Sequence, residues 1–482
     1  MGMNRAPVAD DFTPGRPVVF RNTTVLTIDP SLGVLNGGDV LVVDKRIAAA
    51  GHQLTAPDGA VEIDASGGIL MPGMIDTHRH MWQTALRGYG ADWTLTNYFM
   101  YYYINWGKMF RPEDIYAGNL LSAIEAVDAG VTTGVDWSHG LQTTQHAEAA
   151  VDALEEIPGR WVLAYGNLLG APWVWSRSPE FADFIKRRID GRGDMLRMQM
   201  AFDVTGDPAF PERGAFEAAR DFGLSVTTHA GVWGATNDTG IKQITDAGFM
   251  TPSTVCVHAA TLSDDSYQRI AASGASVSVS SESEASAGQG YSPTWHLRKF
   301  GIPVSLSMDT SVWWSADLFS AMRATVNADR ARDHMEAHKT GDTIVNNYLR
   351  AEQVVTWATM GGAKALGMDS LVGSITPGKR ADLTLIKNDA SPAMFPVVHP
   401  YGHVVFQAGR GDVHTVMVDG RVLKYDHRLR DISLTRAKQA VAATVEYARS
   451  TMGESAWNEV MNPEQSKVEL LDNPYTYTNK QQ

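Results

Sequence analysis

The stretch Met71-Pro-Gly-Met-Ile-Asp-Thr-His-Arg-His80 is a short apolar run that ends in two histidines, His78 and His80. In an extended strand the side chains alternate between two faces, so both imidazoles are expected to point the same way. Two imidazoles at the end of a strand can supply two ligands of a metal site. A pair of ordinary surface histidines is the common alternative, and the rest of the chain decides between the two interpretations.

Eight apolar runs alternate with helical stretches between about residues 70 and 370. The runs cover residues 69–77, 131–136, 161–167, 196–202, 224–229, 254–258, 275–281 and 302–309. Helices are expected between them at 113–129, 146–157, 179–189, 213–222, 264–273 and 318–332. Eight strand–helix units predict an α/β fold with a closed parallel (β/α)8 TIM barrel. A doubly wound open sheet is the alternative, but no Gly-x-Gly-x-x-Gly follows the first run.

Short β-like runs lie on both sides of the predicted barrel. They cover residues 18–21, 24–28 and 38–51 before it, and 378–386, 404–406 and 413–423 after it. Neither set is large enough to form a domain, so we expect them to pair into one small β-sandwich built from both ends of the chain. The predicted division is therefore 1–69 and 371–430 for the sandwich, 70–370 for the barrel, and 431–482 for a C-terminal helix (434–450) and a polar tail (473–482).

The composition narrows the class of protein. The 482 residues are 44% hydrophobic and carry a net charge of −13, which disfavours nucleic acid and anionic membranes as partners. Cys256 is the single cysteine, so neither an internal disulfide nor a cysteine-based zinc site is possible. No apolar run reaches about 18 residues and no signal pattern opens the chain, so a cytoplasmic protein with a small-molecule substrate is expected.

Further ligand-type residues end three of the downstream runs. His229 ends the fifth run, His258 the sixth and Asp309 the eighth. Each alone can be a satisfied core or loop residue. In a TIM barrel, however, the carboxyl ends of all strands meet at one face, where reactive side chains gather. Together with His78 and His80 these residues predict a mixed His/Asp donor set suited to Zn²⁺ or Fe²⁺.

The sequence resembles the amidohydrolase superfamily over nearly its whole length. The resemblance rests on the split β domain, the stretch 71–80, Leu86-Arg-Gly88, Asp309, and Leu371-Val-Gly-Ser-Ile-Thr-Pro-Gly-Lys-Arg-Ala-Asp-Leu383. It is greatest to the branch that contains atrazine chlorohydrolase, melamine deaminase, and cytosine and guanine deaminases. It implies that His78, His80, His229 and Asp309 bind the metal and that His258 contacts the metal-bound water or the substrate. It also implies a homodimer or homotetramer.

The number of metal ions is predicted to be one. Relatives with two ions use a bridging carboxylated lysine near the end of the fourth strand, and residues 195–203 contain no lysine here. Zn²⁺ is favoured and Fe²⁺ is the alternative. A dication lowers the pKa of bound water from about 15.7 toward 7. By the resemblance, Asp309 both ligates the ion and takes the proton of that water.

One position departs from the pattern of this branch. Its typical deaminases carry a glutamate three residues after the histidine of the fifth strand, whereas this chain has Val232. Glu282 and Glu284, after the seventh run, are candidates to replace it as acid and base. If that segment is extended, the two side chains share a face. The alternative is that both are solvated loop carboxylates.

Four residues are predicted to contact the substrate. Trp82 and Gln83 follow the histidine pair, His139 follows the second run, and Trp313 lies in the loop after the eighth. An amide can hydrogen-bond a heterocycle, and aromatic rings suit stacking on a flat ring. Ordinary packing or a subunit interface explains any one of them equally well. Tyr98 and its aromatic neighbours are a candidate lid or subunit contact.

These observations predict a mononuclear metal-dependent hydrolase. It would act on a C–N bond of a small nitrogen heterocycle or amidine, as deaminases do, through metal-activated water. Displacement of chloride or an alkylamine and hydrolysis of a cyclic amide are the alternatives. A non-enzymatic barrel relative is disfavoured because such proteins typically lose their metal ligands.

Overall fold

The computed structural model describes residues 7–232 and 238–464. Its larger sheet has eight parallel strands in sequence order. They are β6 (Met74–Arg79), β7 (Val131–Ser138), β8 (Arg160–Tyr165), β9 (Leu196–Ala201), β10 (Ser225–Ala230), β11 (Val255–His258), β12 (Ser276–Val279) and β13 (Val304–Leu306). A bridge between Arg79 and Asp309 joins the first strand to the last. The predicted (β/α)8 barrel is confirmed.

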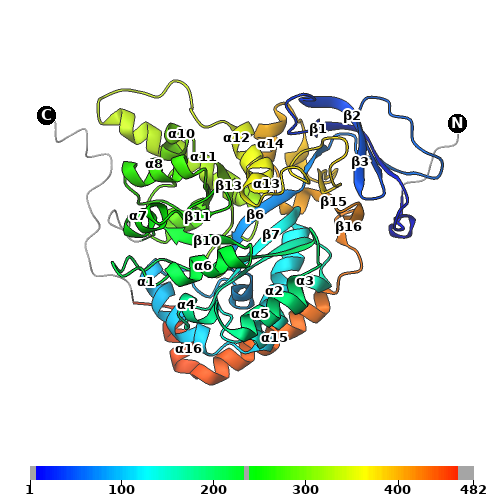
Figure 1. Cartoon of the computed structure of the whole chain (residues 1–482). Helices are drawn as coiled ribbons and strands as arrows, with labels where there is room; N and C mark the ends of the chain where they lie inside the picture. Colours follow the sequence, from blue (N-terminus) through cyan, green and yellow to red (C-terminus); the bar gives the residue numbers. More distant parts are fainter. Residues whose placement is uncertain (1–6, 233–237, 465–482) are drawn as a thin grey trace.

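Helices surround the barrel in Figure 1. They include α2 (Pro112–Asp128), α3 (Thr144–Glu156), α5 (Pro179–Phe184), α6 (Arg213–Asp221), α7 (Thr239–Asp246), α8 (Asp264–Ser273), α10 (Thr294–Phe300) and α11 (Leu318–His338). All six helices expected from the sequence are present. The fifth of these, α8, has the predicted bounds, and α11 continues six residues beyond the predicted end at 332.

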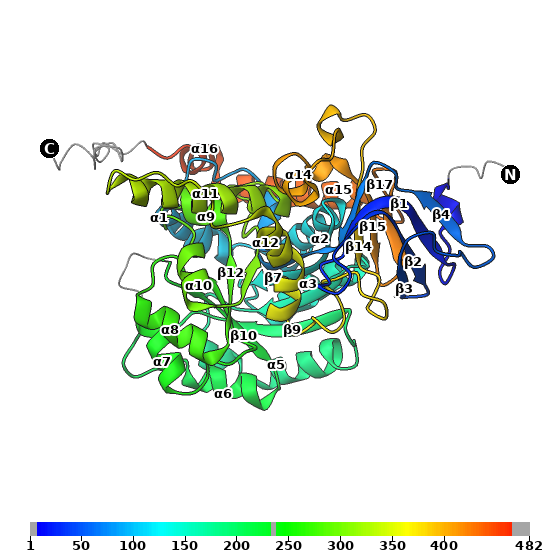
Figure 2. The same cartoon turned by 90° about the horizontal axis from the view of Figure 1, so that it is seen from above.

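The second sheet is mixed and has nine strands taken from both ends of the chain. They are β1 (Val18–Leu26), β2 (Val34–Val43), β3 (Arg46–Gly51), β4 (Val61–Asp64), β5 (Ile69–Pro72), β14 (Leu383–Ile386), β15 (Val413–Val418), β16 (Arg421–Tyr425) and β17 (Arg428–Leu429). Strand β5 pairs with β1 on one side and β14 on the other, which joins the two halves. Figure 2 shows the early and late strands side by side, as predicted.

Residues 404–406 were expected to be a strand of this sheet, and that prediction is wrong. They end helix α14 (Pro400–Phe406). Proline suits the first turn of a helix, and the Nδ1 atom of His399 caps that turn by accepting a hydrogen bond from the Gly402 N–H at 2.9 Å. Val404 and Val405 are fully buried, so a short apolar run here packs as one side of a helix.

The run at 69–77 was expected to be one barrel strand but forms two. Strand β5 belongs to the mixed sheet and β6 to the barrel, with Gly73 between them. A Cβ atom on Gly73 would lie 2.1 Å from Oγ1 of Thr132, so only glycine allows this close passage. We therefore propose Gly73 as the domain boundary in place of residues 69 and 70.

The C-terminal helices lie against the barrel. Helix α15 (Leu434–Met452), followed by α16 (Glu454–Met461), runs beside α2 at the bottom of Figure 1. Thr444 donates a hydrogen bond to Asp114 at 2.8 Å, and Tyr447 donates one to the Met109 carbonyl at 3.0 Å. The predicted helix is confirmed, and the predicted tail at 473–482 lies outside the described residues.

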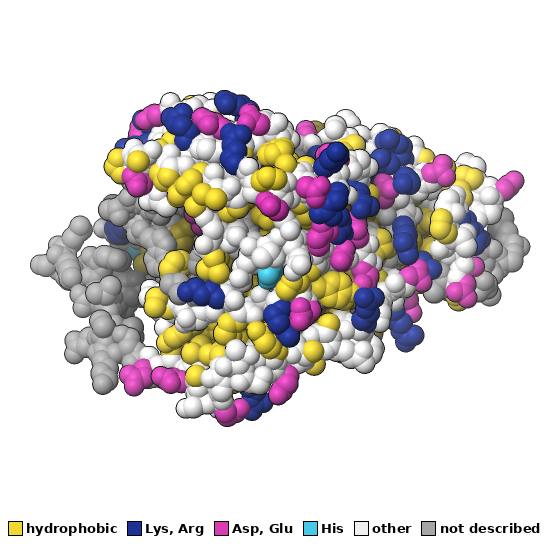
Figure 3. All heavy atoms as spheres, turned by 60° about the horizontal axis from the view of Figure 1, so that its bottom comes forward, with side chains coloured by type: hydrophobic (Ala, Val, Ile, Leu, Met, Phe, Trp, Pro, Cys, Tyr) yellow, Lys and Arg dark blue, Asp and Glu magenta, His cyan; other side chains and the backbone are white. Residues whose placement is uncertain are grey.

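The described surface bears on the partners that the composition disfavours. On the face shown in Figure 3, acidic and basic side chains are interspersed without a large patch of either sign. Such a face lacks the basic stripe that nucleic-acid binding requires. Within the described part of the chain, no helix combines the length and apolar character needed to cross a membrane.

Candidate active site

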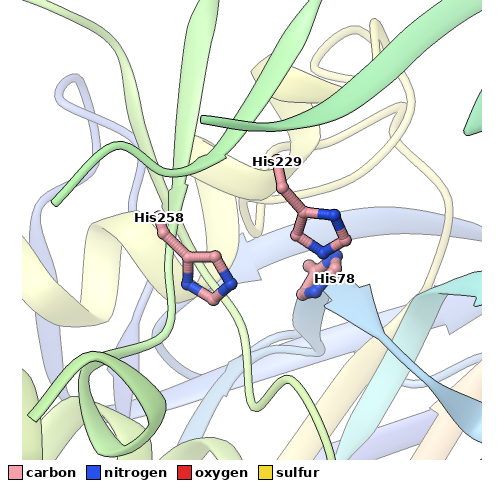
Figure 4. Close-up of side chains that lie close together, drawn as sticks. All are labelled: His78, His229 and His258. Carbon is pink, nitrogen blue, oxygen red and sulfur yellow. The ribbon is translucent and has the colours of Figure 1, made fainter. Parts of the chain in front are cut away.

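The five predicted strand-end residues meet at one end of the barrel. Two groups of these residues share His78. In the first, one possible ligand atom from each of His78, His229 and His258 lies within 4.8 Å of the other two. The second group contains His78, His80 and Asp309 and meets the same limit. Figure 4 shows the rings of His78, His229 and His258 converging from three strands. The barrel therefore gathers donors that are up to 231 residues apart in sequence.

Closure of the barrel positions three of these groups. The backbone N–H of His80 donates to the Asp309 carbonyl at 2.8 Å, and the Asp309 N–H donates to the His78 carbonyl at 3.1 Å. Asp309 adopts a left-handed backbone conformation with φ +65°, as does His258 with φ +68°. Such conformations are costly for residues other than glycine and gather at functional sites.

Hydrogen bonds determine which ring nitrogen of two histidines faces the centre. Nδ1 of His80 donates to the Trp137 carbonyl at 2.8 Å, and Nδ1 of His229 donates to the Asp203 carboxylate at 3.0 Å. Each bond leaves Nε2 with its lone pair available. Nε2 of His78 and Nε2 of His80 lie 3.2 and 3.3 Å from Oδ1 of Asp309, so the donors face a common point.

Burial keeps the first two imidazoles neutral. It lowers the pKa of His80 to about 4 and the pKa of His78 well below its ordinary value. Burial would raise the pKa of Asp309, but the hydrogen bond from His78 and the neighbouring imidazoles outweigh it and hold that pKa below its usual range. Burial also lowers the pKa of His229, and the neighbouring Asp203 reverses this to a net rise.

A cavity of about 310 Å³ opens directly above these donors. Its wall includes His80, His229, His258 and Asp309, the aromatic side chains of Tyr98 and Trp313, and the predicted substrate contact His139. The ring centroids of Tyr98 and Trp313 lie 4.5 Å apart. A flat ring can therefore lie against an aromatic wall while its edge faces the donors.

The model of the amidohydrolase family matches residues 69–423, which is most of the chain. The chain belongs to the amidohydrolase family. This membership confirms the predicted class of enzyme, a hydrolase of carbon–nitrogen bonds, and agrees with the barrel and the strand-end donors described above.

Proteins similar to this amidohydrolase include two kinds of deaminase. A 5'-deoxyadenosine deaminase of Methanosarcina mazei is 27% identical over 86% of this chain and 94% of that protein. A 5-methylthioadenosine/S-adenosylhomocysteine deaminase of Desulfitobacterium hafniense is 29% identical over 84% of this chain and 92% of that protein.

Solved structures share the fold. An adenosine deaminase from Xanthomonas campestris with bound zinc has a TM-score of 0.76 and 20% identity, covering 91% of this chain and 100% of that one. Atrazine chlorohydrolase from Arthrobacter aurescens TC1, complexed with zinc, has a TM-score of 0.76 and 19% identity, covering 89% and 100%.

The donor set of this amidohydrolase suits a divalent metal ion. Imidazole binds metal only when neutral, and the lowered pKa values of His78 and His80 meet that condition. Nδ1 of His78 is buried with no hydrogen-bond partner among the described atoms, while the Nδ1 atoms of His80 and His229 are bonded to the protein. Bonded Nδ1 atoms of this kind orient metal-binding histidines in other proteins.

Two of the predicted substrate contacts lie outside the cavity wall. Trp82 and Gln83 are fully buried and do not line the cavity. Gln83 uses both ends of its amide, donating to the Tyr98 hydroxyl at 2.6 Å and accepting from Thr310 at 2.7 Å. The Trp82 indole N–H donates to Nδ1 of His139 at 3.2 Å, which leaves the proton of the neutral His139 ring on Nε2.

The segment with the two predicted glutamates is a short helix, α9 (Ser281–Ser286), so the expectation of an extended segment is wrong. Residues two apart in a helix point to nearly opposite sides, and Glu282 and Glu284 separate accordingly. Oε2 of Glu282 accepts a hydrogen bond from Ser315 at 2.6 Å. Oε1 of Glu284 is buried 3.5 Å from Nδ1 of His258. Neither glutamate lines the cavity, whereas Val232 does.

Asp203 is a candidate site residue that the sequence did not single out. It lies two residues beyond β9, accepts hydrogen bonds from both Nδ1 and the backbone N–H of His229, and lines the cavity. Its position directly after the fourth apolar run could have identified it, because the other donors were predicted from the same kind of position. Trp313 and His139, by contrast, line the cavity as expected.

Proposed function

We propose that this amidohydrolase removes the exocyclic amino group from the adenine-type ring of a nucleoside. The observation that carries the proposal is the convergence of His78, His80, His229 and Asp309 at the base of a cavity with an aromatic wall. The names of the two curated relatives support an adenine nucleoside as the substrate class. Such a ring is the kind of small nitrogen heterocycle expected from the sequence.

We further propose that His78, His80, His229 and Asp309 hold one divalent ion, with zinc favoured over iron. The zinc bound in the adenosine deaminase from Xanthomonas campestris supports this choice. The absence of lysine from residues 195–203 supports a single ion. When bound, such an ion is a Lewis acid that makes water a nucleophile near neutral pH.

In this proposal the residues of the chain position the substrate and move its protons. Tyr98 and Trp313 flank the ring, and Nε2–H of His139 donates a hydrogen bond to one of its acceptor atoms. A carboxylate oxygen of Asp309 takes a proton from the attacking water, because its lowered pKa keeps it ionised beforehand. The water oxygen bonds to the ring carbon while His258 hydrogen-bonds that oxygen. Asp309 then passes the proton to the amino group, the C–N bond breaks, and ammonia leaves.

A second candidate is displacement of a leaving group other than an amine. The observation that favours it is Val232 on the cavity wall, where the related deaminases are expected to carry a glutamate. An amino group must gain a proton before it leaves, whereas chloride leaves without one. A cavity without that glutamate therefore suits chloride better than an amine.

One experiment separates the two candidates. The zinc-loaded and iron-loaded protein is incubated with adenosine, 5'-deoxyadenosine and 6-chloropurine riboside, and the release of ammonia and chloride is measured. Ammonia release that is lost in His78→Ala supports the proposed function. Chloride release without ammonia release favours the second candidate, and no release by either metal form contradicts both.

The predicted homodimer or homotetramer and the cytoplasmic location stay predictions. Analytical ultracentrifugation of the full chain would test the first. Fractionation of the source cells with detection of the native protein would test the second.

A further inference from the structure

Apart from the metal-type donors, the cavity has a wall of apolar side chains. This wall is formed by Leu95, Phe99, Val204, Val232, Ile241 and Ile244, which we call the apolar wall. Ile241 and Ile244 come from α7 and are 2% and 1% exposed, so their side chains are held by packing. The wall therefore joins the loop after β9, the loop after β10 and helix α7 into one surface.

The carboxylates among the described side chains that line this cavity are not matched by lysine or arginine. Among its lining residues that the structure describes, Asp203 and Asp309 carry charge and none is Lys or Arg. Lys242, which follows Ile241 in α7, has a side chain 48% exposed and lies 3.6 Å from Asp265. Residues 233–237, outside the described residues, read Trp-Gly-Ala-Thr-Asn and contain no basic residue.

We infer that the apolar wall is a subsite for an uncharged, apolar substituent of the substrate and that it rejects carboxylate and phosphate groups. This inference rests on the proposed function. Because the amino-bearing carbon must face the donors, the substituent at the far end of the nucleoside lies against the apolar wall. At that wall an anion would lose its hydration without gaining a cationic side chain from the described lining residues.

The size of the cavity agrees with this inference. At about 310 Å³ it lies at the small end of the range for ligand sites, about 300–1,000 Å³. It suits a purine nucleoside with a compact substituent better than one with an amino-acid chain. Each methylene that reaches the apolar wall should raise kcat/KM several-fold, about fourfold by the usual value for burial of such a group.

The test compares nucleosides that share the adenine ring and differ in the 5' substituent. The metal-loaded protein is assayed with 5'-deoxyadenosine and 5'-methylthioadenosine as neutral substrates, and with adenosine 5'-monophosphate and S-adenosylhomocysteine as charged ones. We expect kcat/KM for the neutral pair to exceed that for the charged pair by about 100-fold or more. Equal values for the two pairs would overturn the inference and leave the proposed function intact.

Variants of the apolar wall provide the second part of the test. Val204→Lys and Val232→Lys place a cation on the wall from two separate loops, at half-buried positions that tolerate a long side chain. Each should raise kcat/KM for the monophosphate and lower it for 5'-methylthioadenosine, so that their ratio changes by about tenfold or more. Val204→Met and Val232→Met are the uncharged controls and should keep the original preference. A ratio unchanged by either lysine contradicts the inference.

Binding measurements keep the two proposals distinguishable. Titration calorimetry with the same four nucleosides reports affinity whether or not ammonia is released. Tighter binding of the neutral pair without ammonia release supports the subsite and contradicts the deaminase function. Equal binding of both pairs, or no binding of any, contradicts the subsite.

Discussion

Asp203 and Glu284 both lie beside a histidine at the carboxyl end of the barrel, and the two pairs differ in how the carboxylate is held. Asp203 accepts from Nδ1 of His229 at 3.0 Å and from the backbone N–H of the same residue at 2.9 Å. Glu284 lies 3.5 Å from Nδ1 of His258, and its Oε1 accepts from the Ser280 N–H at 2.8 Å.

These contacts indicate a different role for each carboxylate. Asp203 fixes the proton of His229 on Nδ1 and directs Nε2 toward the other donors. Glu284 is fully buried and hydrogen-bonded at the start of α9, so it constrains His258 weakly. We therefore expect Asp203 to affect metal affinity and Glu284 to affect turnover.

Removal of His78, a donor whose ring lies near the histidines of both pairs, should have the largest effect. His78→Ala takes away an imidazole whose ring lies 5.0 Å from that of His229 and 5.7 Å from that of His258. We expect bound metal to fall to a small fraction and kcat/KM to fall by about 1,000-fold or more, because metal and nucleophile are lost together. Metal analysis and an ammonia assay measure these effects. The exposed His52, changed to Ala, is the control, and full metal content in His78→Ala would contradict the proposed ligand set.

A change in the Asp203–His229 pair should have the second largest effect. Asp203→Asn keeps the shape but replaces a charged acceptor with an amide, so the His229 ring is oriented less firmly. We expect zinc affinity to fall by about 10–100-fold, measured by competition with a chelator. Asp207→Asn, in the exposed part of the same loop, should leave the affinity unchanged. Unchanged affinity in Asp203→Asn would remove the contrast between the two pairs.

A smaller effect is expected for the Glu284 pair. In Glu284→Gln the amide oxygen can still accept from Ser280, while the charge near His258 is lost. We expect kcat to fall by about tenfold with metal content unchanged, because the loss acts on the proposed proton-transfer step. Glu282→Gln is the matched control from the same helix and should keep kcat near that of the parent. Loss of metal from Glu284→Gln would show that both carboxylates act alike.

A change of Glu282 should have the smallest effect and should alter only the stability of the folded protein. Burial raises the pKa of this carboxyl from its ordinary value of 4.5 to about 7, although the Ser315 hydrogen bond opposes the rise. The folded chain therefore binds this proton more tightly than the unfolded chain, and stability falls as the pH rises from about 4.5 through about 7. Glu282→Gln should add roughly 1–3 kcal/mol to the free energy of unfolding at pH 8 and nothing near pH 4. Urea unfolding across that range measures it, and an equal gain at both pH values would contradict the assignment.

The strand-end donors were predictable because both the apolar runs and the residues that end them can be recognised in the sequence. A buried parallel strand reads as an apolar run, and the residue at its carboxyl end must lie at the barrel mouth. His78, His80, His229, His258 and Asp309 were all found in this way. Asp203 has the same position after its strand, but an aspartate after a strand is common and gives no sign of its partner.

Other features depended on contacts that the sequence does not display. Residues 69–77 form one apolar run, yet the chain passes from one sheet to the other at Gly73 because Thr132 packs against that position. Residues 404–406 have strand-like composition, yet capping by His399 and packing of both valines make them helical. In each case a neighbour distant in sequence or a capping contact outweighs the local propensity of the segment.

The amino-acid sequence was sufficient to predict the barrel and the five strand-end donors, because hydrophobic periodicity and strand polarity are local properties of the chain. The family was indicated by the resemblance of several motifs to known sequences. The three-dimensional packing was needed to show that Asp203 hydrogen-bonds His229, that Glu282 and Glu284 diverge, and that Trp82 and Gln83 lie outside the cavity wall. Those outcomes depend on distances between separate loops. Such distances follow from how the strands and helices pack, which no single segment encodes.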